Sequence, residues 1–163
     1  ALRLAHEVGT VTLLNPAPAQ RFPDPWWKDV DVLTPNRTEA AILLGLDPDG
    51  PESADNLATR VHQRSGATVI LTRGAEGALI CDDRGLTDVP PVPSHAVVDT
   101  TGAGDAFTAA VAVELAAGRS VDDAARFASQ VGAHVVARYE VIPALPRRED
   151  LGRTDLDTGR RTG

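Results

Sequence analysis

Methionine is absent from the 163-residue chain, and cysteine occurs once, at Cys81. A single cysteine excludes an intrachain disulfide and argues against a zinc cluster. No apolar run approaches the roughly 20 residues that span a bilayer. The first residues contain Arg3, His6 and Glu7, so they do not resemble a secretory signal. These absences favour a soluble cytoplasmic protein.

Basic residues are also in deficit. The chain contains 16 lysines and arginines and 23 aspartates and glutamates, which gives a net charge of −7. Such an acidic chain is poorly suited to nonspecific binding of a phosphate backbone, and we expect neither a nucleic-acid nor a membrane partner. The hydrophobic share of 42% is enough for one globular core. Nothing in the sequence indicates the oligomeric state.

The beginning of the chain predicts a helix that lacks a start signal. Apolar residues recur between Ala1 and Val8, Gly9 is a natural stop, and no capping residue precedes them. Together with the missing initial methionine, this pattern leads us to expect a chain cut from a longer protein. An unusual start codon or processing is the alternative.

Strand and helix patterns alternate along the rest of the chain. Short β-branched or apolar runs predict strands at 10–14, 31–34 and 68–71, and a hairpin at 78–81 and 86–89. Periodic runs with capping and stop residues predict helices at 36–44, 53–65, 103–117 and 120–138. This order predicts an α/β fold with a mainly parallel sheet. Residues 1–150 form the predicted folded part, and residues 151–163 a disordered tail.

The strongest local signal is the run from Asp99 to Phe107, Asp-Thr-Thr-Gly-Ala-Gly-Asp-Ala-Phe. Small residues at 102–104 let the backbone approach a ligand, and the free N–H groups of a helix start there make an anion site. Asp105 lies in the first helical turn and could act as a base beside that anion. The alternative is a glycine-rich turn whose Asp105 only favours the helix dipole.

Two further motifs follow predicted strands. Asn36 and Glu39 stand three residues apart at a helix start, a spacing that also forms a capping box. A glycine-containing loop runs from Thr72 to Gly77, and on its own it is equally typical of a strand-to-strand turn.

Together these motifs closely resemble those of the ribokinase-like sugar kinases, the phosphofructokinase-B family. The 99–107 run resembles the family's C-terminal signature, and residues 36–39 its N-x-x-E motif. Residues 15–19, 72–77 and 126–129 agree in order and spacing, so the resemblance covers roughly 1–150. It implies a three-layer α/β/α fold that is incomplete, because the family's N-terminal half and its β-lid are not found here.

The resemblance implies a role for each matching residue. Asp105 would be the general base that contacts the sugar hydroxyl, and the backbone N–H groups of Gly102, Ala103 and Gly104 would form the anion hole. Glu39 would hold Mg²⁺, through water. The ATP-binding residues would be Asn36, Thr72, Arg73, Gly74, Ala75, Glu76, Gly77, Gly104, Asp105 and Ser129.

A potassium site is also implied by the resemblance. Asp99, with backbone carbonyls of Thr101, Val135 and Arg138, matches it. The segment that follows departs from the family pattern, because Glu140 replaces a flexible glycine and Ala144 replaces a serine that could offer an oxygen. K⁺ is therefore a candidate cofactor, and the completeness of its site stays open.

The function implied is transfer of the γ-phosphate of ATP to a sugar hydroxymethyl group, with ribose as the expected acceptor. This chain would supply the ATP site, the anion hole and the base, and would have little activity alone. One alternative is a noncatalytic nucleotide-binding relict. Another is a kinase for a different sugar or for a nucleoside.

Overall fold

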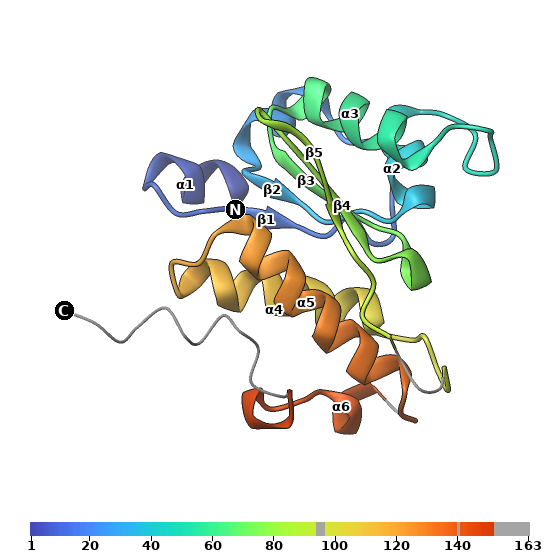
Figure 1. Cartoon of the computed structure of the whole chain (residues 1–163). Helices are drawn as coiled ribbons and strands as arrows, with labels where there is room; N and C mark the ends of the chain where they lie inside the picture. The colour runs from blue at the N-terminus through green and yellow to red at the C-terminus, as the bar shows by residue number, and fades with distance from the viewer. Residues whose placement is uncertain (94–96, 140, 152–163) are drawn as a thin grey trace. The chain divides into compact units, whose positions relative to one another are not determined.

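The computed structural model describes residues 1–93, 97–139 and 141–151. The chain forms two compact units, residues 1–91 and 92–163 (Figure 1). Residues 152–163 of the predicted disordered tail (151–163) and Glu140, which departs from the family pattern, lie outside the described residues. The single folded part over 1–150 stays a prediction.

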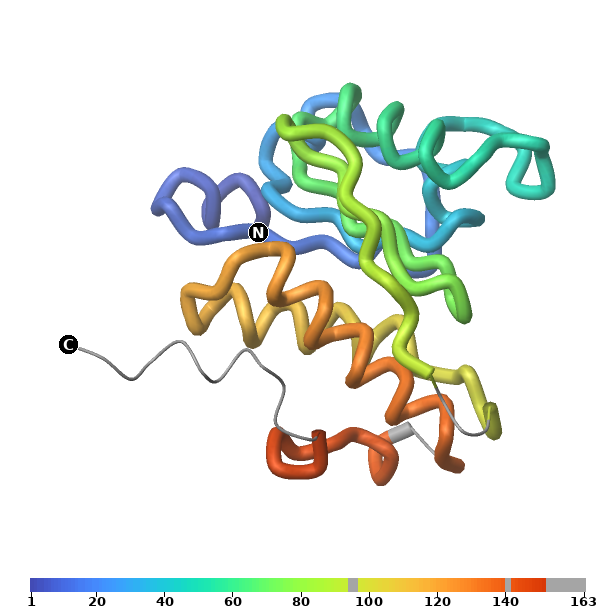
Figure 2. Tube along the Cα trace, in the orientation of Figure 1, coloured from blue at the N-terminus to red at the C-terminus, as the bar shows by residue number. Residues whose placement is uncertain are grey.

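The first unit contains a five-stranded sheet with the order β1-β2-β3-β4-β5. β1 pairs in parallel with β2, and β2 with β3, whereas β3–β4 and β4–β5 are antiparallel (Figure 2). The sheet is therefore mixed rather than mainly parallel, since the predicted hairpin continues the sheet through its last two strands. The strands are Leu13–Leu14, Val32–Leu33, Thr68–Thr72, Ala78–Asp82 and Gly85–Val89.

Helices of the first unit start and stop where the sequence signals predict. Asn36 caps α2 (Arg37–Leu44), and Gly45 ends it with a left-handed φ of 72°. Ser53 caps α3 (Ala54–Ser65) by accepting a hydrogen bond from the Asn56 N–H. The remaining helices are α1 (Leu2–Glu7) and the 3₁₀ turns η1 (Asp24–Asp29) and η2 (Gly74–Glu76).

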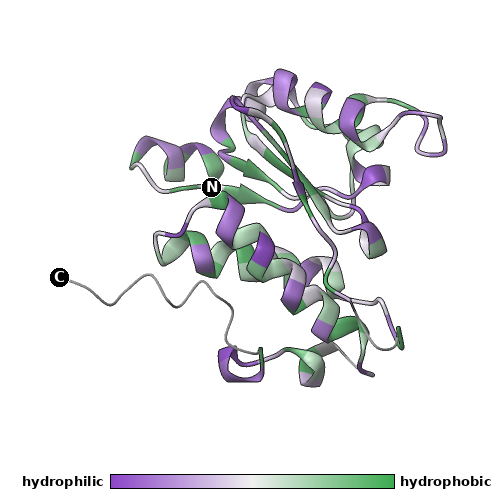
Figure 3. Ribbon diagram, in the orientation of Figure 1, coloured by the Kyte–Doolittle hydropathy of each residue, from purple (hydrophilic) through white to green (hydrophobic). Residues whose placement is uncertain are grey.

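The core of the first unit lies between one face of the sheet and the elements η1, α2 and α3. Apolar side chains of β2, β3 and β4 interdigitate with those of the helices, and Figure 3 shows the strands mainly in hydrophobic colours. The central strand β3 is buried along Val69–Leu71, as its continuous apolar pattern predicts. The buried set includes Trp27, Leu33, Leu43, Leu57, Val61, Val69, Leu71, Leu79 and Cys81.

The second unit is built on α4 (Ala103–Ala116) and α5 (Val121–Val136), followed by α6 (Val141–Ala144) and η3 (Arg148–Asp150). Ser120 caps α5 by accepting from the Asp123 N–H. Alanines let the two long helices pack closely, and Ala124, Ala125 and Ala128 are fully buried.

A buried charge ties the end of the second unit to its helices. Glu114 of α4 is only 3% exposed and forms an ion pair with Arg148 of η3. The Arg148 guanidinium also lies 4.7 Å from the ring centroid of Phe127 on α5. A buried carboxylate needs such a partner, because its desolvation is otherwise uncompensated.

The first strand is shorter and less buried than predicted. Residues 10–14 have the pattern of a strand, but only Leu13–Leu14 pair, and both are half-buried. Thr12 lies just before the paired residues, and its N–H donates to Asp31 Oδ2 at 2.7 Å, while its carbonyl accepts from the Val32 N–H at 2.9 Å. The backbone of Thr12 therefore takes part in the ladder with its carbonyl only.

None of the described helices is both long enough and apolar enough to cross a membrane.

Candidate functional site

The start of α2 carries the predicted Asn36–Glu39 motif as a complete capping box. Asn36 Oδ1 accepts from the Glu39 N–H at 2.9 Å, and Glu39 Oε2 accepts from the Asn36 N–H at 2.8 Å. Asn36 is exposed and Glu39 is half-buried. The capping interpretation of this motif is thus confirmed, and a helix N-terminus is also where a phosphate binds favourably.

The first unit brings two predicted motifs together. Asn36 and Thr72 form an isolated parallel bridge, and the Thr72 N–H donates to the Pro35 carbonyl at 2.9 Å. This bridge continues the parallel pairing of β2 with β3 at their carboxyl ends. In open α/β sheets, ligands bind outside those strand ends.

The glycines of the Thr72–Gly77 loop are required by its shape. Gly74 and Gly77 have φ angles of 58° and 83°. A Cβ on Gly77 would lie 2.2 Å from the Val89 carbonyl oxygen, whereas a Cβ on Gly74 would meet nothing within 4 Å. Gly77 therefore has a packing role, and Gly74 borders open space. Ala75 and Glu76 between them are exposed.

Arg73 holds this loop against the neighbouring hairpin. Its guanidinium donates to the carbonyls of Glu76 and Ala78, each at 3.0 Å, and forms an ion pair with Asp88 of β5. Its backbone N–H donates to the Gly77 carbonyl at 2.8 Å. One terminal nitrogen of the guanidinium makes these contacts, whereas Nε is buried without a hydrogen-bond partner among the described residues. Arg73 thus supports the loop that is predicted to line a nucleotide.

The residues of the predicted anion hole lie at the N-terminus of α4. Gly102 precedes the helix in the left-handed conformation, with φ of 76°, and no side chain caps the first turn. By contrast, side chains cap α2, α3 and α5. The Ala103 N–H donates to the Thr100 carbonyl at 3.3 Å. The first N–H groups of a helix have no acceptor inside it, so the rest of this terminus offers donors and a positive dipole end to an anion.

Asp105 lies exposed in the first turn of α4, one residue after Gly104. Ser129 lies on α5, and its hydroxyl donates to the Ala125 carbonyl at 2.9 Å. Serine hydroxyls within helices commonly donate to the carbonyl four residues earlier, so this bond does not indicate a role for Ser129 in binding.

The residues predicted to hold potassium come together in the second unit. The N–H groups of Val98 and Asp99 donate to the Val136 carbonyl at 2.7 and 3.3 Å, so the 97–101 segment meets the end of α5. Asp99 Oδ1 accepts from the Thr101 N–H at 2.8 Å. Bonds from the Thr101 backbone and side chain hold the pKa of Asp99 below its usual value.

Part of that cluster is already hydrogen-bonded within the chain. The Val135 carbonyl accepts from the Arg138 N–H at 3.1 Å, and the Arg138 guanidinium donates to the His134 carbonyl at 2.9 Å. A fixed positive charge therefore lies at the same helix end. Ala144 is buried and provides no side-chain oxygen.

The Mg²⁺ prediction fits the residues that are present. Among the described residues, no group of three His, Cys, Asp or Glu side chains could enclose a metal ion. Mg²⁺ is commonly held by substrate phosphates, water and one or two carboxylates rather than by a protein cage. Glu39, half-buried beside a helix N-terminus, suits that limited role.

The guanidinium of Arg138 is a feature that the sequence reasoning missed, because only the backbone carbonyl of this residue was assigned a role. A basic residue just past a helix end commonly bonds the last carbonyls of that helix. The position of Arg138 at the end of a predicted helix was therefore a usable signal.

Comparisons with known proteins agree with these motifs. The model of the pfkB family carbohydrate kinases matches residues 1–148. Ribokinase of Haemophilus influenzae is 33% identical over 150 residues, which cover 92% of this chain and 49% of the relative. This chain therefore spans about half the length of that relative.

Solved structures show the same relationship. Arabidopsis thaliana ribokinase, complexed with ribose and ATP, matches with a TM-score of 0.82 and 27% identity over 92% of this chain and 49% of that one. A nucleoside kinase of Burkholderia thailandensis, in complex with inosine, matches with a TM-score of 0.71 and 26% identity over 92% of this chain and 48% of that one.

Proposed function

Because this chain belongs to the pfkB family of carbohydrate kinases, we propose that it supplies the ATP-binding and phosphoryl-transfer residues of a sugar kinase. It has the ribokinase-like α/β fold over about half the length of solved ribokinases. The observation that carries the proposal is the uncapped N-terminus of α4, with Gly102 in the left-handed conformation and Asp105 in the first turn.

The second unit would perform the transfer step. Phosphoryl transfer needs mainly positioning and stabilisation of charge. The N–H groups of Gly102, Ala103 and Gly104 would stabilise negative charge on the transferring phosphoryl group. Asp105 would take the proton from the attacking sugar hydroxyl, so that the oxygen attacks phosphorus as the bond to the ADP oxygen breaks.

The first unit would hold the nucleotide. Asn36 and Thr72 lie together past the carboxyl ends of β2 and β3, and the loop containing Gly74 follows directly. Glu39 would hold Mg²⁺ through water, and the ion would neutralise charge on the phosphates. The capping box, which holds the Glu39 carboxylate against the Asn36 N–H, supports this assignment.

Ribose is the proposed acceptor, by analogy with ribokinase relatives such as that of Haemophilus influenzae. A nucleoside is the second candidate, supported by the 26% identity to the Burkholderia nucleoside kinase.

Because the chain spans about half of these relatives, we also propose that residues 1–163 alone lack sugar kinase activity. An ADP-release assay with ribose tests this, and robust saturable turnover by this chain alone would contradict it.

The role of Asp105 is tested in a chimera that joins the unmatched half of the Haemophilus influenzae ribokinase to this chain. Asp105→Asn should reduce turnover with ribose by about 10²- to 10⁴-fold, the usual contribution of a general base. Mg-ATP affinity should be retained, since the substitution keeps the side-chain shape. Asp123→Asn, in the first turn of α5, is a matched control. Unchanged turnover in Asp105→Asn would remove Asp105 from this role.

A further inference from the structure

The sheet of the first unit ends at β1, and no described residue forms a further strand beyond it. The Thr12 carbonyl accepts from the Val32 N–H at 2.9 Å, and the Leu14 carbonyl accepts from the Thr34 N–H at 3.1 Å. Successive residues of a strand direct their backbone groups to opposite sides, so the N–H and C=O of Leu13 point away from β2. β1 therefore presents a donor and an acceptor at an unpaired edge.

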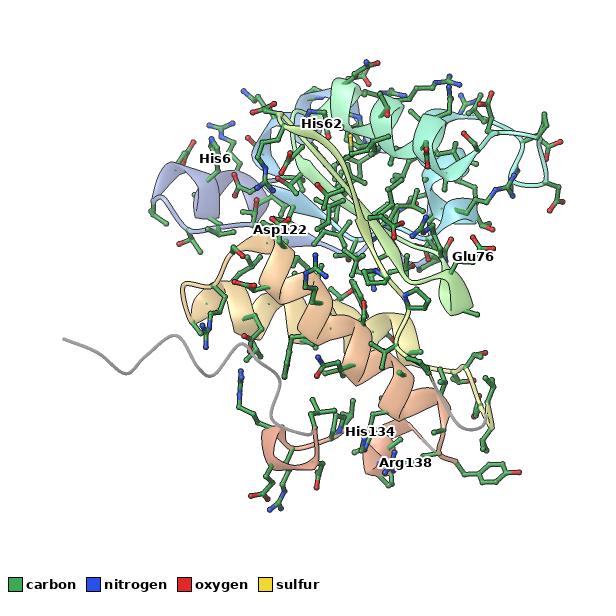
Figure 4. The ribbon with its side chains drawn as sticks, viewed as in Figure 1. His6, His62, Glu76, Asp122, His134 and Arg138 are labelled. Carbon is green, nitrogen blue, oxygen red and sulfur yellow. The ribbon has the colours of Figure 1, made fainter. Side chains whose placement is uncertain are left out.

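Exposed apolar side chains lie in the segment that leads into β1. Leu4 on α1, Val8 at the end of α1 and Val11 just before β1 are 67%, 78% and 64% exposed. His6 also lies on α1 (Figure 4), and its Nδ1 is 3.9 Å from Oδ1 of Asp31, which precedes β2, so α1 is held beside the sheet. Single exposed apolar residues are common, but a series of them next to an unpaired strand edge indicates a binding surface.

The two ends of the sheet differ in composition. At the other end, β5 carries the exposed Asp88, which pairs with Arg73. A charged side chain is typical of an outer strand, because it opposes pairing with another chain. Residues 10–14, by contrast, are Thr-Val-Thr-Leu-Leu without a charge, and β1 runs parallel to β2. Uncharged, largely apolar parallel strands are typical of the inside of a sheet, so β1 has the composition of an internal strand.

The order of the elements indicates which direction a further strand would take. The helix α1 is followed by β1, which pairs in parallel with β2. Two parallel strands are usually connected by a helix, and strands that follow one another in the chain are commonly neighbours. A helix that leads into a parallel strand with an unpaired edge therefore favours a parallel neighbour at that edge.

We propose that the free edge of β1, together with Leu4, Val8 and Val11, is a docking surface for the counterpart of the ribokinase half that this chain does not match. This chain covers 49% of the Haemophilus influenzae ribokinase and 49% of the solved Arabidopsis thaliana ribokinase, so the partner has a comparable length. The partner adds a parallel strand that bonds to the N–H and C=O of Leu13. The docking surface rests on the family relationship, whereas kinase activity of the assembly rests on the proposed function.

Amide hydrogen exchange tests the added strand in the chimera of the unmatched Haemophilus influenzae half with this chain. The Leu13 amide should exchange rapidly in residues 1–163 alone. In the chimera it should exchange at least about tenfold more slowly, because the new strand accepts its hydrogen bond. The Leu14 amide faces β2 in the observed register and should be protected in both proteins, which makes it an internal control.

A substitution at the surface tests the apolar contact. Val11→Lys should lower the unfolding midpoint of the chimera by about 3 °C or more and leave that of residues 1–163 nearly unchanged, since Val11 is covered only in the chimera. Leu86→Lys is the matched control, because Leu86 is 45% exposed on β5, at the other end of the sheet. It should change the two midpoints equally.

Equal exchange of the Leu13 amide in the chimera and in residues 1–163 would overturn the proposal. Slow exchange of this amide in residues 1–163 alone would also overturn it, as would a dimer of this chain that Val11→Lys abolishes, because a second copy would then occupy the edge. Phosphorylation of ribose by the chimera is measured separately. Protection of Leu13 without kinase activity would count against the proposed function and support the docking surface.

Discussion

Asn36 and Thr72 form a parallel bridge just past the ends of β2 and β3, and the Thr72 N–H donates to the Pro35 carbonyl at 2.9 Å. This bridge connects the capping box of α2 with the loop that contains Gly74 and Gly77. Two motifs that are far apart in the sequence therefore lie at one edge of the sheet, where the backbone holds both in place. The proposed nucleotide site needs this arrangement.

Replacing Asn36 by aspartate separates capping from nucleotide binding. Asparagine and aspartate cap helices about equally well, so the free energy of unfolding should change by less than about 0.5 kcal/mol. Mg-ATP affinity should fall about tenfold, because a new negative charge would face the phosphates, and calorimetric titration measures it. Asn56→Asp adds the same charge to the first turn of α3 and serves as the control. Equal effects of the two substitutions would argue against a role for Asn36.

The two glycines of the loop should differ in their tolerance of a side chain. Gly77→Ala places a Cβ 2.2 Å from the Val89 carbonyl oxygen and should cost about 3 kcal/mol of unfolding free energy. Gly74→Ala meets open space and should cost about 1 kcal/mol, for its positive φ alone. Urea unfolding measures both. Equal losses of unfolding free energy in the two variants would show that the close approach to the Val89 carbonyl does not determine the cost of a side chain at Gly77.

The ion pair between Glu114 and Arg148 should stabilise the second unit. Arg148→Ala leaves the buried Glu114 carboxylate with Arg119, whose Nε lies 4.0 Å away. Since Arg148 is itself 60% exposed, we expect a loss of about 1–3 kcal/mol rather than the full cost of an unpaired buried charge. Arg147→Ala, at an exposed pair, should change the unfolding free energy by less than about 0.5 kcal/mol. If Arg148→Ala lowers the unfolding free energy by no more than Arg147→Ala does, the pair between Glu114 and Arg148 does not stabilise this unit.

His134 should make the stability of the chain depend on pH. Burial lowers the pKa of His134, and the nearby Arg138 charge lowers it further, while Asp150 opposes the shift. The folded state therefore binds a proton at His134 less readily than the unfolded state, in which the pKa of histidine is about 6.5. Stability from the neutral histidine is present above that pH and is lost as the pH falls below it. Urea unfolding between about pH 7.5 and 5.5 should show a decline that His134→Gln reduces; an unchanged decline would contradict this assignment.

Local signals predicted most of the fold. Gly45 and Gly66 end helices in the left-handed conformation, and Ser53 and Ser120 cap helices, where the sequence indicated. These features depend on a few neighbouring residues, so the sequence suffices to find them. The bond from the Thr12 N–H to the Asp31 side chain at the start of β1 could not be foreseen, because the two residues are 19 positions apart.

The site was predicted less completely than the fold. The spacing of Asn36 and Glu39 predicted their capping box, but the sequence did not indicate that Arg73 holds its loop against the hairpin. Arg73 reaches Asp88 across the hairpin, 15 residues away, and nothing local to residues 72–77 indicates that contact. Arg138 likewise was predicted to contribute only its carbonyl, since the direction of a long side chain depends on the packed helix end.

A calorimetric titration of residues 1–163 with Mg-ATP decides whether the proposed nucleotide site exists. We expect saturable binding by the folded chain, with weaker binding by Asn36→Asp and undiminished binding by Asp105→Asn. A chain that is folded by circular dichroism, and yet binds no Mg-ATP, would contradict the proposed function, and would favour a relict that keeps the motifs without their function.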